Sequence, residues 1–344
     1  MAITRTDKND ATRTRLVQEL RTNRMFSMTG AGLSCWAGYP AWTPFLDRLA
    51  ARVHEYDEAV DIALVQRQFA GLPLQLAGKL GHYLATEFEP FIQSQFGPAG
   101  GSSFDDVLYL FASLPLQHHI SFNFDTSLER AHPQSTHSCD SLTSARRADL
   151  IEFLRLCDTE NYVKRVVHLH GLYSDAIEGI VFTEPGYAKF YNDTTFYKKF
   201  LGSIFSTRSL LFTGFGFVDE DFLNTLGEWK RDTREKEAHL QHFAIYSLKD
   251  GEDDEQIRTR LATEFRVDAL FYEVRANTNG SEDHREFSNI IQGLTESLGI
   301  AGPQRATPAI VIEPHITSAD AQNQRIAELN EHALNRTTGG LPDA

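Results

Sequence analysis

Residues 25–34 have the sequence MFSMTGAGLS, in which a short apolar run stops at two glycines. Before this run, Leu16, Val17 and Leu20 are spaced as on one face of a helix within residues 11–23. A short apolar run that ends at glycines is typical of a buried strand followed by a tight turn. The order of helix, buried strand and glycine turn indicates a protein in which helices pack on a sheet.

Short apolar runs of the same kind recur along the chain, and longer helix-like stretches separate them. They lie at residues 119–122, 165–169, 209–213, 243–246 and 270–274. Alternation of short buried strands with helices predicts an α/β fold, a doubly wound and mostly parallel Rossmann-like sheet with helices on both faces. Because such sheets bind ligands at the carboxyl ends of their strands, the residues that follow each run are the candidates for a ligand site.

The domain organisation follows from changes in the pattern. We expect residues 1–300 to form one domain, with a helical insertion at about residues 55–115, where no strand is evident and the periodicity is helical. The insertion could shape a pocket or a subunit contact. After about Gly302 the chain becomes polar and contains several prolines, so residues 301–344 are predicted to form a loose tail or an assembly arm.

The composition excludes several classes of protein. A net charge of −14 over 344 residues argues against a general nucleic-acid-binding surface, although a local basic patch stays possible. No apolar run approaches the roughly 20 residues of a membrane helix, and the start MAITRTDKND lacks the apolar core of a secretion signal. We therefore expect a cytoplasmic protein that does not contact a membrane.

The cysteines are few and scattered. Cys35, Cys139 and Cys157 form no Cys-x-x-Cys pair, so they favour neither a disulfide framework nor a four-cysteine zinc site. Histidine-based metal sites are not excluded by this count.

Four of the predicted strands end in residues that suit ligand binding. These ends have the sequences TGAGLS (29–34), FNFD (122–125), HLHG (168–171) and TGFGFVD (213–219). The glycine loop alone is as typical of a tight turn as of a pyrophosphate-binding loop, because Cys35 stands where a dinucleotide-binding fingerprint has its third glycine. Four such ends along one sheet favour a shared ligand site.

In their order and spacing these motifs resemble the sirtuin superfamily. The pattern of that superfamily is a Gly-Ala-Gly-x-Ser loop, a Gly-x-Pro segment, an Asn-x-Asp strand end, a His-Gly pair and a later glycine turn. The resemblance spans about residues 24–275 and implies a Rossmann-like domain that binds NAD as substrate. By this resemblance the diphosphate is held by Gly30, Ala31, Gly32 and Ser34, and the adenosine ribose is lined by Gly214, Phe215 and Gly216 with Asp219 beside them. By the same resemblance Asn123 holds the nicotinamide ribose or a water, Asp125 faces the carboxamide, and His170 is the catalytic base. Pro40 and Trp42 also belong to the cofactor site.

These residue types suit cleavage of the nicotinamide–ribose bond. Departure of nicotinamide leaves a ribosyl cation, which the oxygen atoms of Asn123 and Asp125 could stabilise. A histidine has an ordinary pKa of about 6.5 and can take a proton near neutral pH. We prefer His170 to His168 as this base, because His170 lies at the strand end beside a glycine. His168 is then interpreted as a packed or hydrogen-bonded strand histidine.

The sequence also departs from the protein-deacylating sirtuins. Those enzymes carry a zinc ribbon between the His-Gly pair and the later glycine turn, whereas this interval contains no cysteine here. Instead we predict a strand at residues 181–183 and then a helix with aromatic residues, Tyr187, Phe190 and Tyr191, which we interpret as core. After Pro40 the chain has Ala41-Trp42-Thr43 in place of an Asp-Phe-Arg motif, and Trp42 could cap the pocket or only pack. No metal site and no acyl-lysine groove are therefore expected.

With these departures the chain looks similar to the zinc-less sirtuin-like NAD hydrolases of bacterial anti-phage systems. The resemblance implies an NAD glycohydrolase that releases nicotinamide and ADP-ribose and is gated by a partner, either a HerA-type ATPase or a short Argonaute. A homo-oligomer is also expected. An ADP-ribosyltransferase, a deacylase or a non-catalytic NAD or ADP-ribose sensor are the alternatives.

Overall fold

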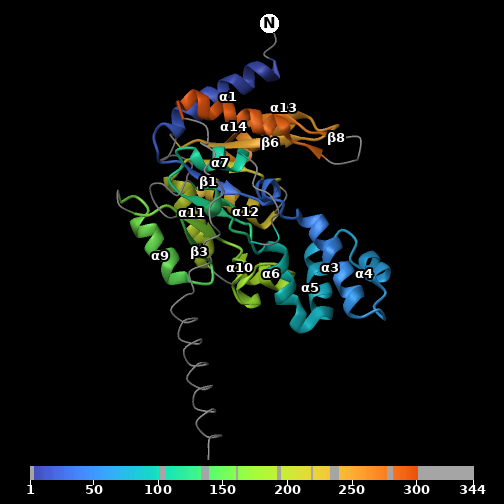
Figure 1. The fold of residues 1–344 in the computed structure, drawn as a ribbon. Coiled ribbons are helices and arrows are strands. Elements are labelled where there is room, and N and C mark those ends of the chain that lie inside the picture. Colours follow the sequence, from blue (N-terminus) through green and yellow to red (C-terminus); the bar gives the residue numbers. More distant parts are fainter. Residues whose placement is uncertain are drawn as a thin grey trace, which may run out of the picture. The chain divides into compact units, whose positions relative to one another are not determined.

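The central sheet of the computed structural model contains seven strands, and all of them run parallel (Figure 1). The structure describes residues 4–98, 100, 106–132, 139–159, 162–191, 195–217, 220–232, 240–276 and 282–300. The strands are β1 (Phe26–Thr29), β2 (His119–Ser121), β3 (Asp140–Thr143), β4 (Arg165–His168), β5 (Leu210–Thr213), β6 (His242–Leu248) and β7 (Val267–Glu273). Their order across the sheet is β3-β4-β2-β1-β5-β6-β7. The predicted α/β doubly wound fold is thus confirmed.

Helices cover both faces of this sheet. The α-helices are α1 (Arg5–Leu20), α2 (Ala31–Ser34), α3 (Trp42–Tyr56), α4 (Ile62–Gln68), α5 (Pro73–Leu84), α6 (Phe88–Phe96), α7 (Asp106–Ser113), α8 (Ser127–Ala131), α9 (Arg147–Leu156), α10 (Glu184–Tyr191), α11 (Thr195–Thr207), α12 (Glu220–Asp232), α13 (Asp254–Phe265) and α14 (Arg285–Leu298). Three short 3-10 turns are η1 (Cys35–Ala37), η2 (Ala85–Glu87) and η3 (Ile177–Gly179), and β8 (Arg275–Ala276) pairs antiparallel with β9 (Glu282–Asp283).

The strands are apolar at successive positions because both of their faces are buried. Within β4, Val166 packs into one hydrophobic core and Val167 into the other. Within β5, Leu211 and Phe212 divide in the same way. Side chains of a strand alternate between the two faces of a sheet, so a strand covered on both sides loses the alternation of polar and apolar residues. This explains why continuous apolar runs located most of the strands.

The sequence patterns missed one strand and predicted one strand that does not form. The edge strand β3 was not predicted, because its sequence DSLT is polar and its first residue is exposed. Residues 181–183 were predicted to form a strand, but they form an irregular segment between η3 and α10. Their one sheet-like contact is the hydrogen bond from Val181 N to His170 O, at 2.8 Å.

The described residues between η1 and β2 form helices and no strand, from α3 to α7. α3 packs on α5, and α7 packs on α14. Phe45 of α3 and Phe96 of α6 reach the pocket described below. The predicted tail at residues 301–344 lies outside the described residues.

No helix in the described ranges is both long enough and apolar enough to cross a bilayer.

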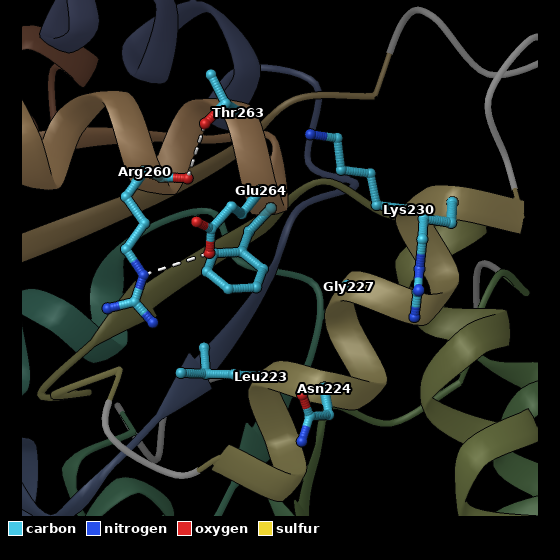
Figure 2. A pocket seen from close by; sticks show the side chains of 9 residues that line it. Leu223, Asn224, Gly227, Lys230, Arg260, Thr263 and Glu264 are labelled. Carbon is cyan, nitrogen blue, oxygen red and sulfur yellow. Dashed lines mark hydrogen bonds and ion pairs between the residues drawn. The ribbon is translucent and has the colours of Figure 1, made fainter.

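A second cavity, of about 580 Å³, lies between α12 and α13 (Figure 2). Lys230, Arg231 and Arg260 contribute to its lining. Lys230 and Arg231 stand in the last turn of α12, where positive charge stabilises the carbonyl end of a helix. α12 follows the carboxyl end of β5, and α13 leads into the amino end of β7. This cavity therefore lies toward the amino ends of the strands, away from the carboxyl ends where such sheets bind ligands.

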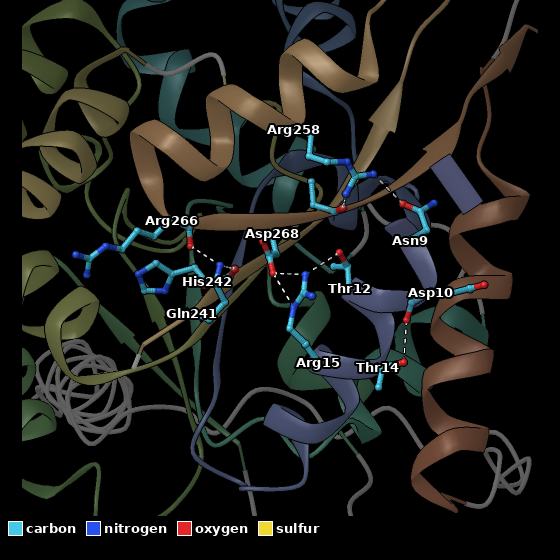
Figure 3. A network of polar contacts seen from close by, with 11 residues as sticks. Asn9, Asp10, Thr12, Thr14, Arg15, Gln241, His242, Arg258, Arg266 and Asp268 are labelled. Carbon is cyan, nitrogen blue, oxygen red and sulfur yellow. Dashed lines mark hydrogen bonds and ion pairs between the residues drawn. The ribbon is translucent and has the colours of Figure 1, made fainter. Parts of the chain in front are cut away.

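The side chain of Asn9 protects the free edge of β7. Figure 3 shows its contact with Arg258. Its Nδ2 donates to Phe271 O at 2.8 Å, and its Oδ1 accepts from Phe271 N at 3.2 Å. Arg258 of α13 donates to Asn9 Oδ1 at 3.2 Å and to Ala269 O at 2.8 Å. Asn9 therefore supplies the two hydrogen bonds that a further strand would supply, and it leaves less of the edge open to pairing with another chain.

We predict that Asn9→Ala lowers the free energy of unfolding by about 1–3 kcal/mol, because both backbone groups of Phe271 lose a partner. Urea denaturation measures this change. Asp10→Ala, at the exposed neighbouring position of α1, should change the free energy by less than about 0.5 kcal/mol and is the control. Equal effects of the two substitutions would contradict the assigned role of Asn9.

Several histidines are buried in the neutral form. Burial lowers the pKa of His118 to about 4 and those of His132, His170 and His242 to about 3, and it holds the pKa of His119 well below its ordinary value. His242, at the start of β6, is fully buried, and neither of its ring nitrogens has a hydrogen-bond partner among the described residues. Below pH 6.5 the unfolded chain binds protons that the folded chain does not, so acid destabilises the fold.

The unfolding free energy should therefore decrease as the pH falls from about 6.5 toward 4. We expect His242→Leu to remove about 2 kcal/mol of the decrease between pH 6.5 and 4.5 and not to weaken the protein at pH 7.5. Urea denaturation of both proteins at the three pH values tests this. If both lose equal stability in acid, the burial of a neutral His242 is wrong.

Candidate functional site

The ends of four neighbouring strands are aligned across the sheet. Thr29, the last residue of β1, pairs with Ser121 of β2 and with Thr213 of β5, and Ser121 pairs in turn with His168 of β4. On one side of β1 lie β2, β4 and β3, which follow β1 in the chain, and on the other side lie the later strands β5, β6 and β7. The point between β1 and β5 is therefore the topological switch point, where doubly wound folds bind their ligands.

A cavity of about 250 Å³ lies at these strand ends. The predicted site residues that line it are Gly30, Ala31, Ser34, Pro40, Trp42, Asn123, Asp125, His170, Gly214, Phe215 and Gly216. Gly32 does not line the cavity but packs against Gly214, and Asp219 falls outside the described residues. The structure thus brings together segments that are up to about 180 residues apart in the sequence.

The glycine turns that follow β1 and β5 pack backbone against backbone. Gly30 N donates to Thr213 O, and Gly32 N donates to Gly214 O, both at 3.1 Å. A Cβ on Gly30 would lie 2.5 Å from Gly214 O, and a Cβ on Gly214 would lie 2.2 Å from Leu33 N. Gly214 also has a φ of +63°, a left-handed conformation that disfavours other residues. Contact between the two turns is therefore itself sufficient reason for these glycines.

Asn123 is connected to the glycine loop. Its Nδ2 donates to Gly30 O at 2.9 Å, and its backbone N donates to Ser121 Oγ at 3.1 Å. Within the described part of the chain, Oδ1 receives no hydrogen bond. The amide is therefore held in one orientation, with its oxygen left as an acceptor for a ligand.

Asp125 and Ser34 place unpaired polar atoms at the pocket. Both are at least 97% buried, and neither Asp125 Oδ2 nor Ser34 Oγ makes a hydrogen bond of good geometry with the described residues. Burial raises the pKa of the Asp125 carboxyl, against the effect of the hydrogen bond that Ser127 N donates to Oδ1. Buried polar groups without partners are costly, so this pair is suited to a polar ligand that satisfies them.

His170 lies just beyond β4, in a box of aromatic rings. The rings of Phe122 and Tyr187 stand edge-on to its imidazole, with centroids 4.8 and 5.1 Å away, and its Nε2 lies 3.2 Å from the Tyr191 hydroxyl. This desolvated setting lowers the pKa of His170 to about 3. The imidazole is therefore neutral at physiological pH, as a proton acceptor must be.

Aromatic side chains that were not predicted as site residues form much of the rest of the pocket wall. These are Phe45, Phe96, Phe122, Phe124 and Tyr187. For Phe122 and Phe124 the signal was present, since they alternate with Asn123 and Asp125 in one strand end. Tyr187 was interpreted as core, but it lines the pocket. Trp42 does both of the things considered for it, because it lines the pocket and packs on Phe182 with ring centroids 5.2 Å apart.

Among the residues with described positions, no group of three or more His, Cys, Asp or Glu side chains could hold a metal ion. The pocket itself contains amide, carboxyl, imidazole and hydroxyl groups.

We predict that Gly214→Ala lowers the free energy of unfolding by about 1–3 kcal/mol, because the new methyl group meets the backbone of Leu33 at a left-handed φ. Gly202→Ala is the matched control. That glycine lies within α11 with open space around its Cβ position, so alanine should stabilise the protein by about 0.5–1 kcal/mol. Thermal and urea unfolding measure both, and a neutral Gly214→Ala would contradict the close contact of the two turns.

Comparison with known protein families adds one match. The model of the family described as a SIR2-like domain matches residues 117–269, which is less than half of the chain and runs from just before β2 into β7. This range contains Asn123, Asp125, His170 and the turn at Gly214, whereas the glycine loop after β1 lies before it. No curated protein matches the sequence. Residues 117–269 are similar to the SIR2-like family, and this similarity supports a sirtuin-like relationship, NAD binding and an NAD-dependent enzyme activity.

Proposed function

We propose that this protein is an NAD glycohydrolase, which cleaves the nicotinamide–ribose bond of NAD with water and releases nicotinamide and ADP-ribose. The main support is the convergence of Asn123, Asp125 and His170 on one pocket at the switch point of the sheet. Ligand binding alone does not need a neutral, buried imidazole beside an oriented amide oxygen. The similarity to SIR2-like domains supports NAD as the substrate.

The proposed reaction needs no second macromolecule. The bond between C1′ of the ribose and the ring nitrogen breaks, and nicotinamide leaves with the electron pair. The ribosyl cation that remains is stabilised by oxygen acceptors, for which Asn123 Oδ1 and the Asp125 carboxyl are suited. A water oxygen then forms the new bond to C1′, and one proton of this water passes to His170.

The hydrogen bond to Tyr191 is compatible with Nδ1 of His170 as the atom that accepts the proton. If the Tyr191 hydroxyl accepts from Nε2–H, then Nδ1 carries the free lone pair, and Nδ1 is the basic atom. The low pKa keeps this atom unprotonated before NAD binds.

Control of this activity belongs to the same proposal. Unrestrained NAD hydrolysis would deplete the cell that makes the enzyme, so we propose a cytoplasmic effector of anti-phage defence that acts when a separate sensor is engaged. A HerA-type ATPase or a short Argonaute is the proposed partner, and a homo-oligomer the proposed state. The helices α3–α7 and the tail at residues 301–344 are the proposed contact regions.

We predict that His170→Ala lowers the rate of nicotinamide release by about 10²–10⁴-fold, because the water loses its proton acceptor. The purified chain is incubated with NAD, alone and with each candidate partner, and nicotinamide and ADP-ribose are quantified by chromatography. Calorimetry with ADP-ribose should show that the variant still binds. Gln18→Ala, which changes an exposed residue of α1 outside the pocket and the proposed contact regions, is the control and should retain full activity.

Each other result has a definite meaning. Equal release by wild type and His170→Ala contradicts the role of His170. Binding of NAD without release under every condition replaces the hydrolase by a sensor. Release of nicotinamide without free ADP-ribose indicates transfer of ADP-ribose to a second substrate.

A further inference from the structure

His168 makes two short hydrogen bonds behind the pocket. It is the last residue of β4, and its side chain is 1% exposed. Its Nδ1 lies 2.8 Å from the backbone oxygen of Asn123, and its Nε2 lies 2.8 Å from Glu129 Oε1 in α8. His168 does not line the cavity, so it does not belong to the set of groups that meet NAD in the proposed function.

The two partners determine the protonation of the ring. A backbone carbonyl can only accept a hydrogen bond, so Nδ1 must carry a proton. A carboxylate likewise only accepts, so Nε2 carries the second proton when Glu129 is ionised. Burial would lower the pKa of His168, but the negative charge of Glu129 and the hydrogen bonds outweigh it and raise the pKa. His168 is thus the exception among the buried histidines described above.

Glu129 is itself held in place. Its Oε1 also accepts a hydrogen bond from Ser141 Oγ of β3, and its side chain is 10% exposed. The connection therefore runs from β3 and α8 through the imidazole to the backbone of Asn123. Nδ2 of Asn123 continues it to the glycine loop. The positive ring also favours the ionised form of the buried Asp125 carboxyl.

We propose that His168 and Glu129 are positioning residues, a buried imidazolium–carboxylate pair that holds the backbone of Asn123 so that the Asn123 amide and the Asp125 carboxyl meet the ribose in a fixed geometry. The expected effect of this pair on the reaction rate rests on the proposed NAD hydrolase function. A displacement of about 1 Å at reacting groups costs on the order of 100-fold in rate, so the pair acts mainly on the chemical step.

The kinetic test compares three variants of the full chain under the condition that activates the wild type. His168→Leu removes both hydrogen bonds and should lower kcat at least tenfold with less than a threefold change in KM. His168→Asn retains an N–H donor near Nδ1 and should recover part of this loss. Glu129→Gln retains a hydrogen-bond acceptor without the negative charge, and its kcat should lie between those of His168→Leu and His168→Asn. His242→Leu, a buried strand histidine with no hydrogen-bond partner among the described residues, is the matched control and should leave kcat unchanged.

Two measurements test the pair without any enzyme activity. Nitrogen NMR of the histidine rings, assigned with His168→Leu, should show both nitrogens of His168 protonated at pH 7.5 and one of them unprotonated in Glu129→Gln. Hydrogen–deuterium exchange of a peptide that covers residues 121–126 should be faster in His168→Leu than in wild type, and His168→Asn should restore part of the protection. A neutral ring in the wild type, or unchanged exchange in His168→Leu, overturns the proposal.

The two proposals fail differently. If the wild type releases no nicotinamide with any partner while the NMR and exchange results hold, the hydrolase is wrong and the positioning pair stands. If the wild type hydrolyses NAD and His168→Leu keeps its kcat, the hydrolase stands and the positioning pair is wrong.

Discussion

The contact between the glycine turns after β1 and β5 is the constraint on which the site depends. These strands are neighbours at the switch point of the sheet, and their turns are joined by hydrogen bonds from Gly30 N to Thr213 O and from Gly32 N to Gly214 O. A Cβ at Gly30 or Gly214 would lie within 2.5 Å of backbone atoms. This close approach fixes the positions of the two turns relative to each other at the carboxyl ends of β1 and β5. The pocket forms between these turns and the ends of β2 and β4.

Asn123 transmits this constraint to the other half of the site. Its side chain donates to Gly30 O of the glycine loop, and its backbone oxygen accepts from the His168 ring. The strand ends of β1, β2 and β4 are thereby connected through one residue. Hydrogen-bonded groups that are buried in this way lose conformational freedom, which suits an amide whose oxygen must keep one direction.

Opposite protonation states of two nearby histidines follow from their partners. The imidazole of His170 is surrounded by aromatic rings, and the Tyr191 hydroxyl is its one hydrogen-bond partner among the described residues, so burial keeps it neutral. His168 lies between a carbonyl and a carboxylate, and its pKa is raised. Residues two positions apart can thus serve as a proton acceptor and as a buried cation because their immediate surroundings differ.

The sequence alone determined the fold class and located most of the polar residues that line the pocket. Buried parallel strands require continuous apolar runs, and the carboxyl ends of such strands must share one edge, so the motifs at 29–34, 122–125, 168–171 and 213–219 could be expected to meet. The edge strand β3 escaped prediction because an exposed strand has no apolar run. Only the tertiary structure decided that Tyr187 lines the pocket, that Gly32 packs against Gly214, and that His168 pairs with Glu129. Each of these depends on which side chains from distant segments become neighbours, and a local pattern of polar and apolar residues does not specify that.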